Sequence, residues 1–268
     1  MHKVDLAIKQ HCGSRDEQQD AAGRDDPDSP ETEHRGTLAV LSDGIGGMSN
    51  GAGAARTTVA AFRDSYRLKS PEETVQTALR RALKAANAGV LQFAQTSGAT
   101  RGCGATVVAA VICRNFADSR YELYWVSTGD SRAYLLRDGL AFRLTIDHAF
   151  GEDHKLGAKP QTEREVEPAE LTSFIGLPTE SLRIDGNRRP FWLKPGDCVL
   201  LASDGLYGSL DEAELADGIR QDLGAGCQHL IQLALNQHLE NQDNITVVAM
   251  RPATETSRKI LSIGRALG

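Results

Sequence analysis

Two aspartates follow matching apolar runs at distant points of the sequence. Asp43 comes after the run at residues 38–42 (LAVLS), Asp204 comes after the run at residues 199–203 (VLLAS), and a glycine follows each aspartate. A single Asp-Gly pair is usually only a turn. Its repetition after two apolar runs favours a second interpretation, in which two buried strands each deliver a carboxylate to one site.

Asp20 and Asp243 add two more carboxylates beside predicted strands. The sequence has no cluster of cysteine and histidine of the kind that binds zinc. Carboxylate and carbonyl oxygens favour Mg²⁺ or Mn²⁺ instead. Because clustered aspartates without a metal repel one another and raise their own pKa values, we expect divalent cations if these carboxylates converge.

The chemistry open to such a centre is hydrolysis. Two divalent ions a few ångströms apart can share a bridging hydroxide, neutralise a phosphate and orient in-line attack. The five cysteines lack an activating context, and the glycines at 44–47 lack the Gly-Lys-Ser/Thr of a P-loop. These features favour attack by a metal-activated water over a nucleophilic side chain or a P-loop mechanism.

The composition argues against nucleic acid and membranes as binding partners. The 268 residues carry 30 Lys+Arg against 36 Asp+Glu, a net charge of −6, which gives no field to attract nucleic acid or an anionic membrane. No apolar run approaches the ~20 residues that span a bilayer, and the N-terminus lacks the pattern of a signal peptide. We therefore expect a cytoplasmic protein without nucleic-acid or membrane partners, and we expect a monomer.

Hydrophobic periodicity predicts the elements that must position the carboxylates. Two helices are predicted after the apolar run at residues 38–42, and Ser70 is expected to cap the second. Two more helices are predicted near the C-terminal end. Ser209 with Glu212 is expected to open one, and the other covers roughly 226–240. Strands are predicted at 4–8, 37–41, 106–112, 121–127, 132–136, 141–144, 198–202 and 245–250. This order does not fit alternating βαβ units. It favours an α+β fold, a four-layer α/β/β/α sandwich whose two central antiparallel sheets are flanked by helix pairs.

The chain length fits one large domain. We expect a single catalytic domain over 1–252, interrupted by a long irregular insert at 148–185, and a flexible polar tail at 253–268.

Seven short motifs occur in an order that resembles the type 2C metal-dependent serine/threonine protein phosphatases (the PPM family), compact bacterial type. Each motif alone is weak, but together they cover residues 13 to about 250. They are Arg15…Gln18-Gln19-Asp20, Ser42-Asp43-Gly44-Ile45-Gly46-Gly47, Gly104-Ala105-Thr106, Gly129-Asp130-Ser131-Arg132, Leu144-Thr145-Ile146-Asp147-His148, Ser203-Asp204-Gly205-Leu206 and Asp243-Asn244-Ile245-Thr246.

The resemblance implies a β-sandwich with helix pairs outside and a set of metal ligands. Asp43 would bridge two ions of Mn²⁺ or Mg²⁺. The Gly44 carbonyl and Asp20 would hold one ion, and Asp204 and Asp243 would hold the other. The position of the 148–185 insert matches the mobile flap of the family.

The same resemblance implies roles for Arg15 and Asp130, whereas the positions of Arg132, Asp147 and His148 favour structural roles. Arg15 would bind the substrate phosphate, which an arginine can grip with two parallel hydrogen bonds. A third, weaker ion would use Asp130 with help from Asp204, although Asp130 equally suits a turn between strands. For Arg132 we expect an internal ion pair, and for Asp147 and His148 structural hydrogen bonds.

The functional prediction is a phosphoprotein phosphatase that hydrolyses phosphoserine and phosphothreonine by attack of a water or hydroxide bridging two divalent metals, counteracting a bacterial Ser/Thr kinase. Two alternatives stay open: a catalytically silent relative that binds phosphoproteins, and a hydrolase of another phosphoester. Ile45 stands where many eukaryotic relatives carry histidine, so a general acid is absent there.

Overall fold

Two antiparallel sheets pack face to face and form the centre of the protein. The computed structural model describes residues 4–99, 102–115, 117–150, 170–219 and 222–253. The first sheet has the strand order β1 (Val4–His11), β11 (Ile245–Pro252), β10 (Cys198–Ala202), β6 (Arg132–Arg137) and β7 (Leu140–Arg143). The second has the order β2 (Ala21–Asp25), β3 (Thr37–Ser42), β4 (Val107–Arg114), β5 (Tyr121–Thr128) and β8 (Asp185–Gly186), with β9 (Phe191–Leu193) also paired to β5.

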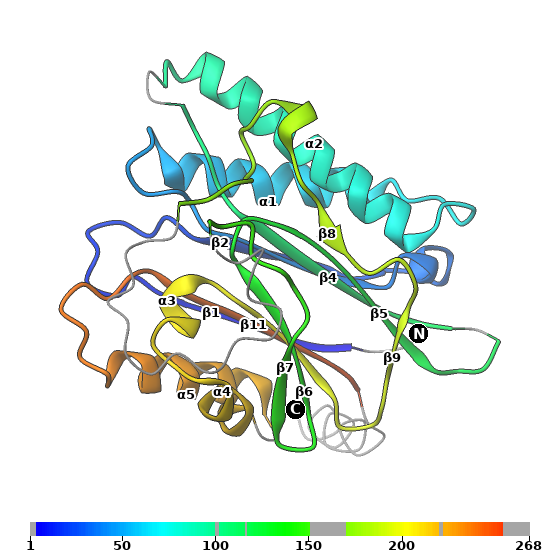
Figure 1. The fold of residues 1–268 in the computed structure, drawn as a ribbon. Coiled ribbons are helices and arrows are strands. Elements are labelled where there is room, and N and C mark those ends of the chain that lie inside the picture. The colour runs from blue at the N-terminus through cyan, green and yellow to red at the C-terminus, as the bar shows by residue number, and fades with distance from the viewer. Residues whose placement is uncertain (1–3, 100–101, 116, 151–169, 220–221, 254–268) are drawn as a thin grey trace, which may run out of the picture.

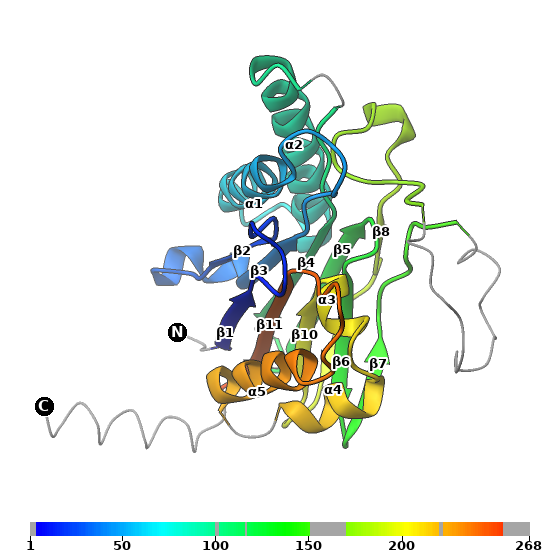
Figure 2. The same ribbon diagram turned by 90° about the vertical axis from the view of Figure 1, so that its left-hand side faces the viewer.

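One pair of helices covers the outer face of each sheet. The helices α1 (Gly51–Arg67) and α2 (Val75–Thr96) lie on the second sheet, and α4 (Glu212–Gly218) and α5 (Leu223–Leu235) lie on the first (Figures 1 and 2). Three short helices complete the described elements: η1 (Pro30–Arg35), η2 (Thr179–Ser181) and α3 (Asp204–Tyr207). This arrangement confirms the predicted four-layer α/β/β/α sandwich.

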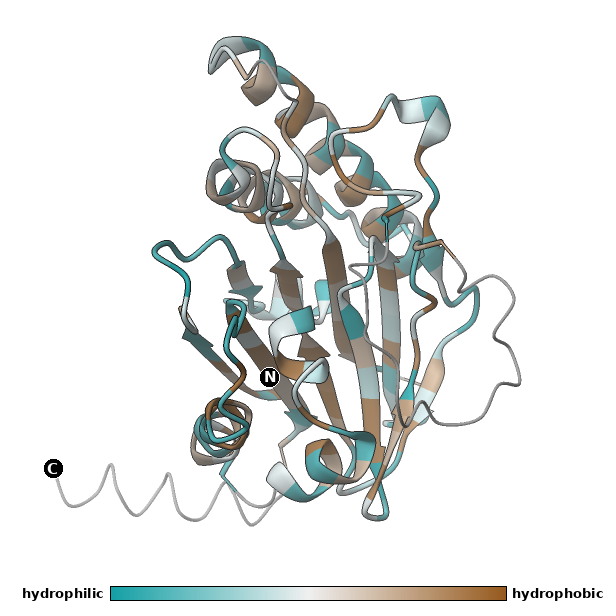
Figure 3. Ribbon diagram, turned by 60° about the vertical axis from the view of Figure 1, so that its left-hand side comes forward, coloured by the Kyte–Doolittle hydropathy of each residue, from teal (hydrophilic) through white to brown (hydrophobic). Residues whose placement is uncertain are grey.

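The core forms three apolar layers because the central strands are buried on both faces. Along β3, Leu38 and Val40 point toward α1 and α2, whereas Ala39 and Leu41 point toward the other sheet. Leu200 of β10 packs in the third layer, under α4 and α5. Continuous burial explains why these strands read as unbroken apolar runs in the sequence, and Figure 3 shows the hydrophobic colour concentrated in the strands.

The start of α2 differs from the prediction. Ser70 does not cap it; Thr74 does, through a bond of 3.2 Å from the Thr77 N–H to its Oγ1. Glu73 lies near this helix start, but its carboxylate binds Arg81 at 2.8 Å. A stronger charge-assisted partner inside the helix therefore takes the carboxylate away from the backbone.

The C-terminal helix pair is also shifted from the prediction. Asp211 caps α4 in a capping box with Glu214, while the hydroxyl of Ser209 donates to the Gly205 carbonyl at 2.9 Å. The last helix is α5 at Leu223–Leu235 rather than 226–240, because Asp222 supplies its N-cap.

The described ends of the 148–185 insert pair with each other. Ala149 and Leu171 form an isolated bridge, and the Thr172 N–H donates to the His148 carbonyl at 2.8 Å. Most of the insert, 151–169, and the predicted tail from 254 onward lie outside the described residues. The division into one catalytic domain and a tail therefore stays a prediction. Among the helices of the described ranges, none is long and apolar enough to cross a membrane.

Candidate active site

Five aspartates lie where strands begin or end at one edge of the sandwich. Asp20 immediately precedes β2, Asp43 immediately follows β3, and Asp130 lies between β5 and β6. Asp204 starts α3 just after β10, and Asp243 lies two residues before β11. Because β2 runs antiparallel to β3, and β10 antiparallel to both β6 and β11, these positions fall at the same edge.

Asp43 is held by its backbone in the continuation of the second sheet. Its N–H donates to Thr106 Oγ1 at 3.0 Å, and its carbonyl accepts from the Thr106 N–H at 2.8 Å. Part of the residue reaches solvent, but its carboxyl group is surrounded by protein atoms. Burial raises its pKa well above the usual range, and the negative charges of Asp20, Asp204, Asp130 and Asp243 raise it further.

Asp20 and Asp204 lie against the Asp43 carboxyl group from two sides. Burial is the main cause that raises the pKa of each to about 6, although Thr246 Oγ1 donates to Asp20 Oδ2 at 2.6 Å and so opposes the shift for Asp20. Asp20 Oδ1 and Asp204 Oδ1 are buried with no hydrogen-bond partner. Buried carboxylate oxygens without a hydrogen-bond donor are suited to a divalent cation, so these two oxygens fit cation ligands.

Asp130 joins the same acidic group. Burial raises its pKa to about 7, and the charges of Asp204 and then Asp147 add to that effect. The structure therefore brings the two residues of the predicted third ion together. Whether they bind it stays a prediction.

Asp243 makes a different contact from the other four. Its Oδ2 accepts from Arg15 Nη2 at 2.8 Å, in a pair whose side chains are 40% and 53% exposed. Across the described ranges, no group of three or more histidine, cysteine, aspartate or glutamate side chains stands ready to hold an ion by itself. The negative charge of Asp243 raises the pKa values of Asp20, Asp43 and Asp204, so its carboxylate is close to theirs. The Asp243 side chain nevertheless binds Arg15.

Gly44 occupies a point where backbones approach closely. A Cβ there would lie 2.4 Å from the Gly51 carbonyl oxygen and 2.8 Å from that of Gln19. The Gly44 N–H donates to the same Gln19 carbonyl at 3.2 Å. Only glycine fits between these segments, and the predicted carbonyl ligand is thereby fixed beside Asp43.

Sequence reasoning gave no role to Asn244, which organises the loop that carries Arg15. Its Nδ2 donates to the carbonyls of Cys12 at 2.8 Å and Glu17 at 3.0 Å, and its Oδ1 accepts from the Gln19 N–H at 2.7 Å. The only signal in the sequence was its place in the motif after Asp243. Thr106 and Thr246 also lie in these motifs, and the sequence predicts no function for either residue.

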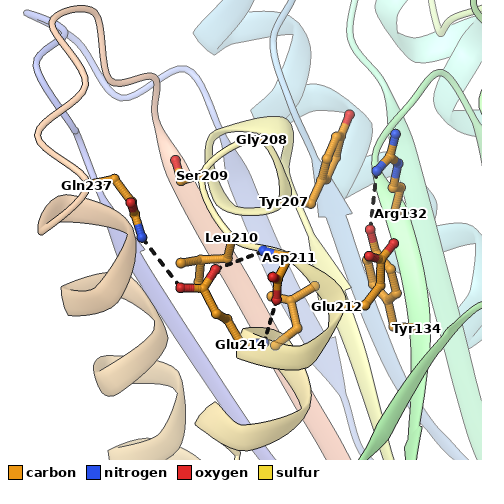
Figure 4. Close-up of a pocket in the computed structure, with 11 residues that line it drawn as sticks. Arg132, Tyr134, Tyr207, Gly208, Ser209, Leu210, Asp211, Glu212, Glu214 and Gln237 are labelled. Atoms are coloured by element: carbon orange, nitrogen blue, oxygen red, sulfur yellow. Dashed lines mark hydrogen bonds between the residues drawn. The ribbon is translucent and has the colours of Figure 1, made fainter. Parts of the chain in front are cut away.

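A pocket of about 510 Å³ beside α3 and α4 contains none of the five aspartates (Figure 4). One of its walls includes Arg132, Tyr134 and Tyr207, and Glu212 and Glu214 lie on α4. The predicted chemistry is therefore not in this pocket. Arg132 instead makes the predicted internal ion pair, with Asp147.

The family follows from the sequence itself. A sequence model described as protein phosphatase 2C matches residues 10–242. The chain belongs to the protein phosphatase 2C family. Membership confirms the reaction class, serine/threonine protein phosphatase, and the substrate class, phosphorylated protein.

Individual relatives agree with this family. The serine/threonine phosphatase Stp of Listeria welshimeri is 26% identical over 222 residues, which cover 79% of this chain and 82% of the relative. The structure of PppA, described as a key regulatory component of the T6SS in Pseudomonas aeruginosa, is 27% identical with a TM-score of 0.70 and covers 93% of this chain and 98% of its own. Both cover most of each protein.

A third comparison concerns the fold and the metals of another protein. The catalytic domain of the serine/threonine protein phosphatase PstP, 22% identical, superposes with a TM-score of 0.70 over 94% of this chain and 99% of its own. That structure contains two manganese ions. Their presence in a protein of this fold agrees with the prediction of Mn²⁺ or Mg²⁺ as cofactor.

Proposed function

We propose that this member of the family hydrolyses phosphoserine and phosphothreonine in proteins with two divalent cations, Mn²⁺ or Mg²⁺, held by the aspartate cluster. Asp43 would contact both ions, Asp20 and the Gly44 carbonyl one, and Asp204 and Asp243 the other. The observation that carries this assignment is the pair of buried, unpartnered oxygens of Asp20 and Asp204 against Asp43. Bound cations would activate the attacking water and neutralise charge on the phosphate.

Arg15 is the residue we assign to the substrate phosphate. It lies at the rim of the cluster with its side chain 53% exposed, so its guanidinium can meet a ligand arriving from solvent. Its contact with Asp243 orients the side chain, and Asn244 fixes the loop beneath it. A guanidinium keeps further N–H donors for a phosphate while one of them binds a carboxylate.

Asp130 with Asp204 is our proposed site for a third, weaker ion. The support is that both carboxyl groups are buried and each disfavours ionisation of the other. We further propose that the enzyme reverses a bacterial Ser/Thr kinase and works in the cytoplasm as a monomer.

The two alternatives make different predictions for a single experiment. Phosphoserine and phosphothreonine peptides and a nucleotide are incubated with the protein, with Mn²⁺ or with EDTA, and released phosphate is measured. Our proposal predicts Mn²⁺-dependent release from the peptides. Tight peptide binding with bound metal and no release would favour the silent relative, and release from the nucleotide alone would favour another phosphoesterase.

A further inference from the structure

Arg132 joins three segments of the chain at the edge of the aspartate cluster. It is the first residue of β6, two positions after Asp130. Its guanidinium binds Asp147 with Nη2 at 2.7 Å and Nε at 3.1 Å, and the two side chains are only 19% and 4% exposed. Arg143 Nη2 occupies the other oxygen of Asp147 at 2.8 Å.

The same guanidinium lies on the ring of Tyr207. The distance from Arg132 Cζ to the ring centroid is 3.7 Å, and Figure 4 shows the two side chains side by side, with Arg132 also bonded to the Tyr134 hydroxyl at 3.3 Å. Tyr207 is the last residue of α3, and Asp204 is the first. Because this helix is a single turn, the position of the Tyr207 ring determines the position of Asp204.

The residues on both sides of Asp130 bind neighbouring residues of one segment, Asp147 and His148. On one side, the Gly129 N–H donates to His148 Nδ1 at 3.2 Å and the Gly129 carbonyl accepts from the His148 N–H at 2.9 Å. On the other side, Arg132 binds Asp147, the neighbour of His148. The loop with Asp130 is therefore fixed at both ends to the described stem of the 148–185 insert.

We propose that Arg132 is a positioning residue for the metal site: its stack on Tyr207 and its ion pair with Asp147 hold Asp204 and Asp130 in the orientation that binds cations. This inference rests on the function proposed above and adds residues that touch neither metal nor substrate. Side chains that orient metal ligands typically change metal affinity by about 10–100-fold when they are altered. Lysine cannot replace Arg132, because it lacks the planar group that both stacks and binds a carboxylate with two bonds.

The chain offers a matched control on the same strand. Arg137, the last residue of β6, binds Asp197 with Nε at 2.9 Å, and its guanidinium faces the ring of Phe191 at 5.2 Å. The Arg137 and Asp197 side chains are 17% and 2% exposed, so this pair is as buried as the pair of Arg132 and Asp147. Five residues of strand separate the two arginines by about 17 Å. Arg137→Lys should therefore reproduce the structural cost without touching the metal site.

The test measures Mn²⁺ affinity by calorimetry, with the fold checked by circular dichroism and thermal unfolding. Arg132→Lys and Tyr207→Leu should each weaken Mn²⁺ binding about 10-fold or more, and the double variant should bind no more weakly than Arg132→Lys alone, because that substitution already removes the stack on Tyr207. Tyr207→Phe, which keeps the ring, and Arg137→Lys should stay within about threefold of the wild type. Tyr207→Met is a second variant of Tyr207 if the leucine variant does not fold.

Unchanged affinity in folded Arg132→Lys, or a loss no larger than that of Arg137→Lys, would overturn the inference while leaving the proposed function intact. A wild-type protein that binds no Mn²⁺ would overturn both, and this failure is recognisable because it precedes any substitution.

Discussion

The candidate active site depends on individual carboxyl groups. Asp20, Asp43 and Asp204 are buried against one another, and burial is in each case the largest cause that raises the pKa. An arrangement that raises the pKa of three neighbouring acids destabilises the metal-free protein. Such an arrangement is typical of functional sites rather than of structural ion pairs.

Arg15→Ala tests the separation between phosphate and metal binding. If the bound phosphate excludes water from its contact with Arg15, the two form a desolvated charge pair, and removing Arg15 should lower kcat/KM by the equivalent of about 2–4 kcal/mol. The Arg15–Asp243 pair is exposed, and exposed pairs contribute at most about 1 kcal/mol. Mn²⁺ affinity by calorimetry should therefore change by less than about fivefold. A fall in metal affinity as large as the kinetic loss would contradict the assignment of Arg15 to the phosphate.

Ile45 tests whether leaving-group protonation limits the reaction. It lies beside the cluster, with its N–H bonded to the Gly104 carbonyl at 3.0 Å, and it cannot supply a proton. Aryl phosphates leave without help, whereas a seryl or threonyl oxygen benefits from protonation. Ile45→His should therefore accelerate phosphothreonine peptides more than an aryl phosphate, by at most ~10²-fold because the new ring is not preorganised. An equal change for both substrates would show that protonation does not limit turnover.

At the scale of the elements, the short helix α3 positions Asp204 of the candidate site. It is four residues long and starts with Asp204. Gly205, its second residue, lies so close to the start of β11 that a Cβ would be 2.2 Å from the Asn244 carbonyl oxygen. Position and packing of this one turn therefore determine where the Asp204 carboxylate stands.

Gly205→Ala should displace α3 from the segment before β11. We expect a loss of about 1–3 kcal/mol in the free energy of unfolding, the usual cost of overpacking, together with weaker Mn²⁺ binding. Gly46→Ala is the control, because a Cβ at Gly46 meets nothing within 4 Å. Thermal unfolding and calorimetry on both variants check this, and equal behaviour of the two would contradict the role given to the close contact.

The sequence predicts the elements well where apolar runs are long and less well where polar contacts decide. Strands such as β3 and β10 were predicted because they are buried on both faces. The predicted starts of α2 and α4 are wrong because Thr74 and Asp211 cap them. The choice between neighbouring capping residues depends on side-chain contacts, such as that of Glu73 with Arg81, which the hydrophobic pattern does not show. Asn244 and the stack of Arg132 on Tyr207 join segments far apart in sequence, so no local pattern reveals them.

For the whole molecule, the raised carboxyl pKa values predict how stability depends on pH without metal. Burial raises the pKa of Asp204 in the folded protein from its ordinary value of 3.8 to about 6, so the folded state binds more protons than the unfolded state between these values. Its contribution to stability is therefore fully present below about pH 4 and is lost as pH rises through about 6.

Asp204→Asn isolates this effect, because asparagine resembles the protonated acid. In EDTA, the variant should unfold at a higher temperature than the wild type at pH 7.5, and the difference should shrink toward zero at pH 4. In Mn²⁺ at pH 7.5 the order should reverse, since the wild type gains stability from two ions and the variant from one at most. A variant that is less stable by the same amount at both pH values in EDTA would contradict the burial of a strained carboxylate at this position.

Phosphate release by Asp43→Asn and Asp204→Asn follows from the same arrangement. Each removes a charge that no neighbouring side chain replaces, and we expect activity on a phosphothreonine peptide to fall by several orders of magnitude while circular dichroism stays native. Near-normal rates in either folded variant would contradict a catalytic role for the cluster.

The stoichiometry of Mn²⁺ binding tests the central claim most directly. Calorimetry on the wild type should give at least two ions per chain. Asp43→Asn, which alters the ligand that we propose for both ions, should lose both high-affinity sites, whereas Asp243→Asn should lose only one. An Asp43→Asn variant that still binds two ions with wild-type affinity would contradict the account.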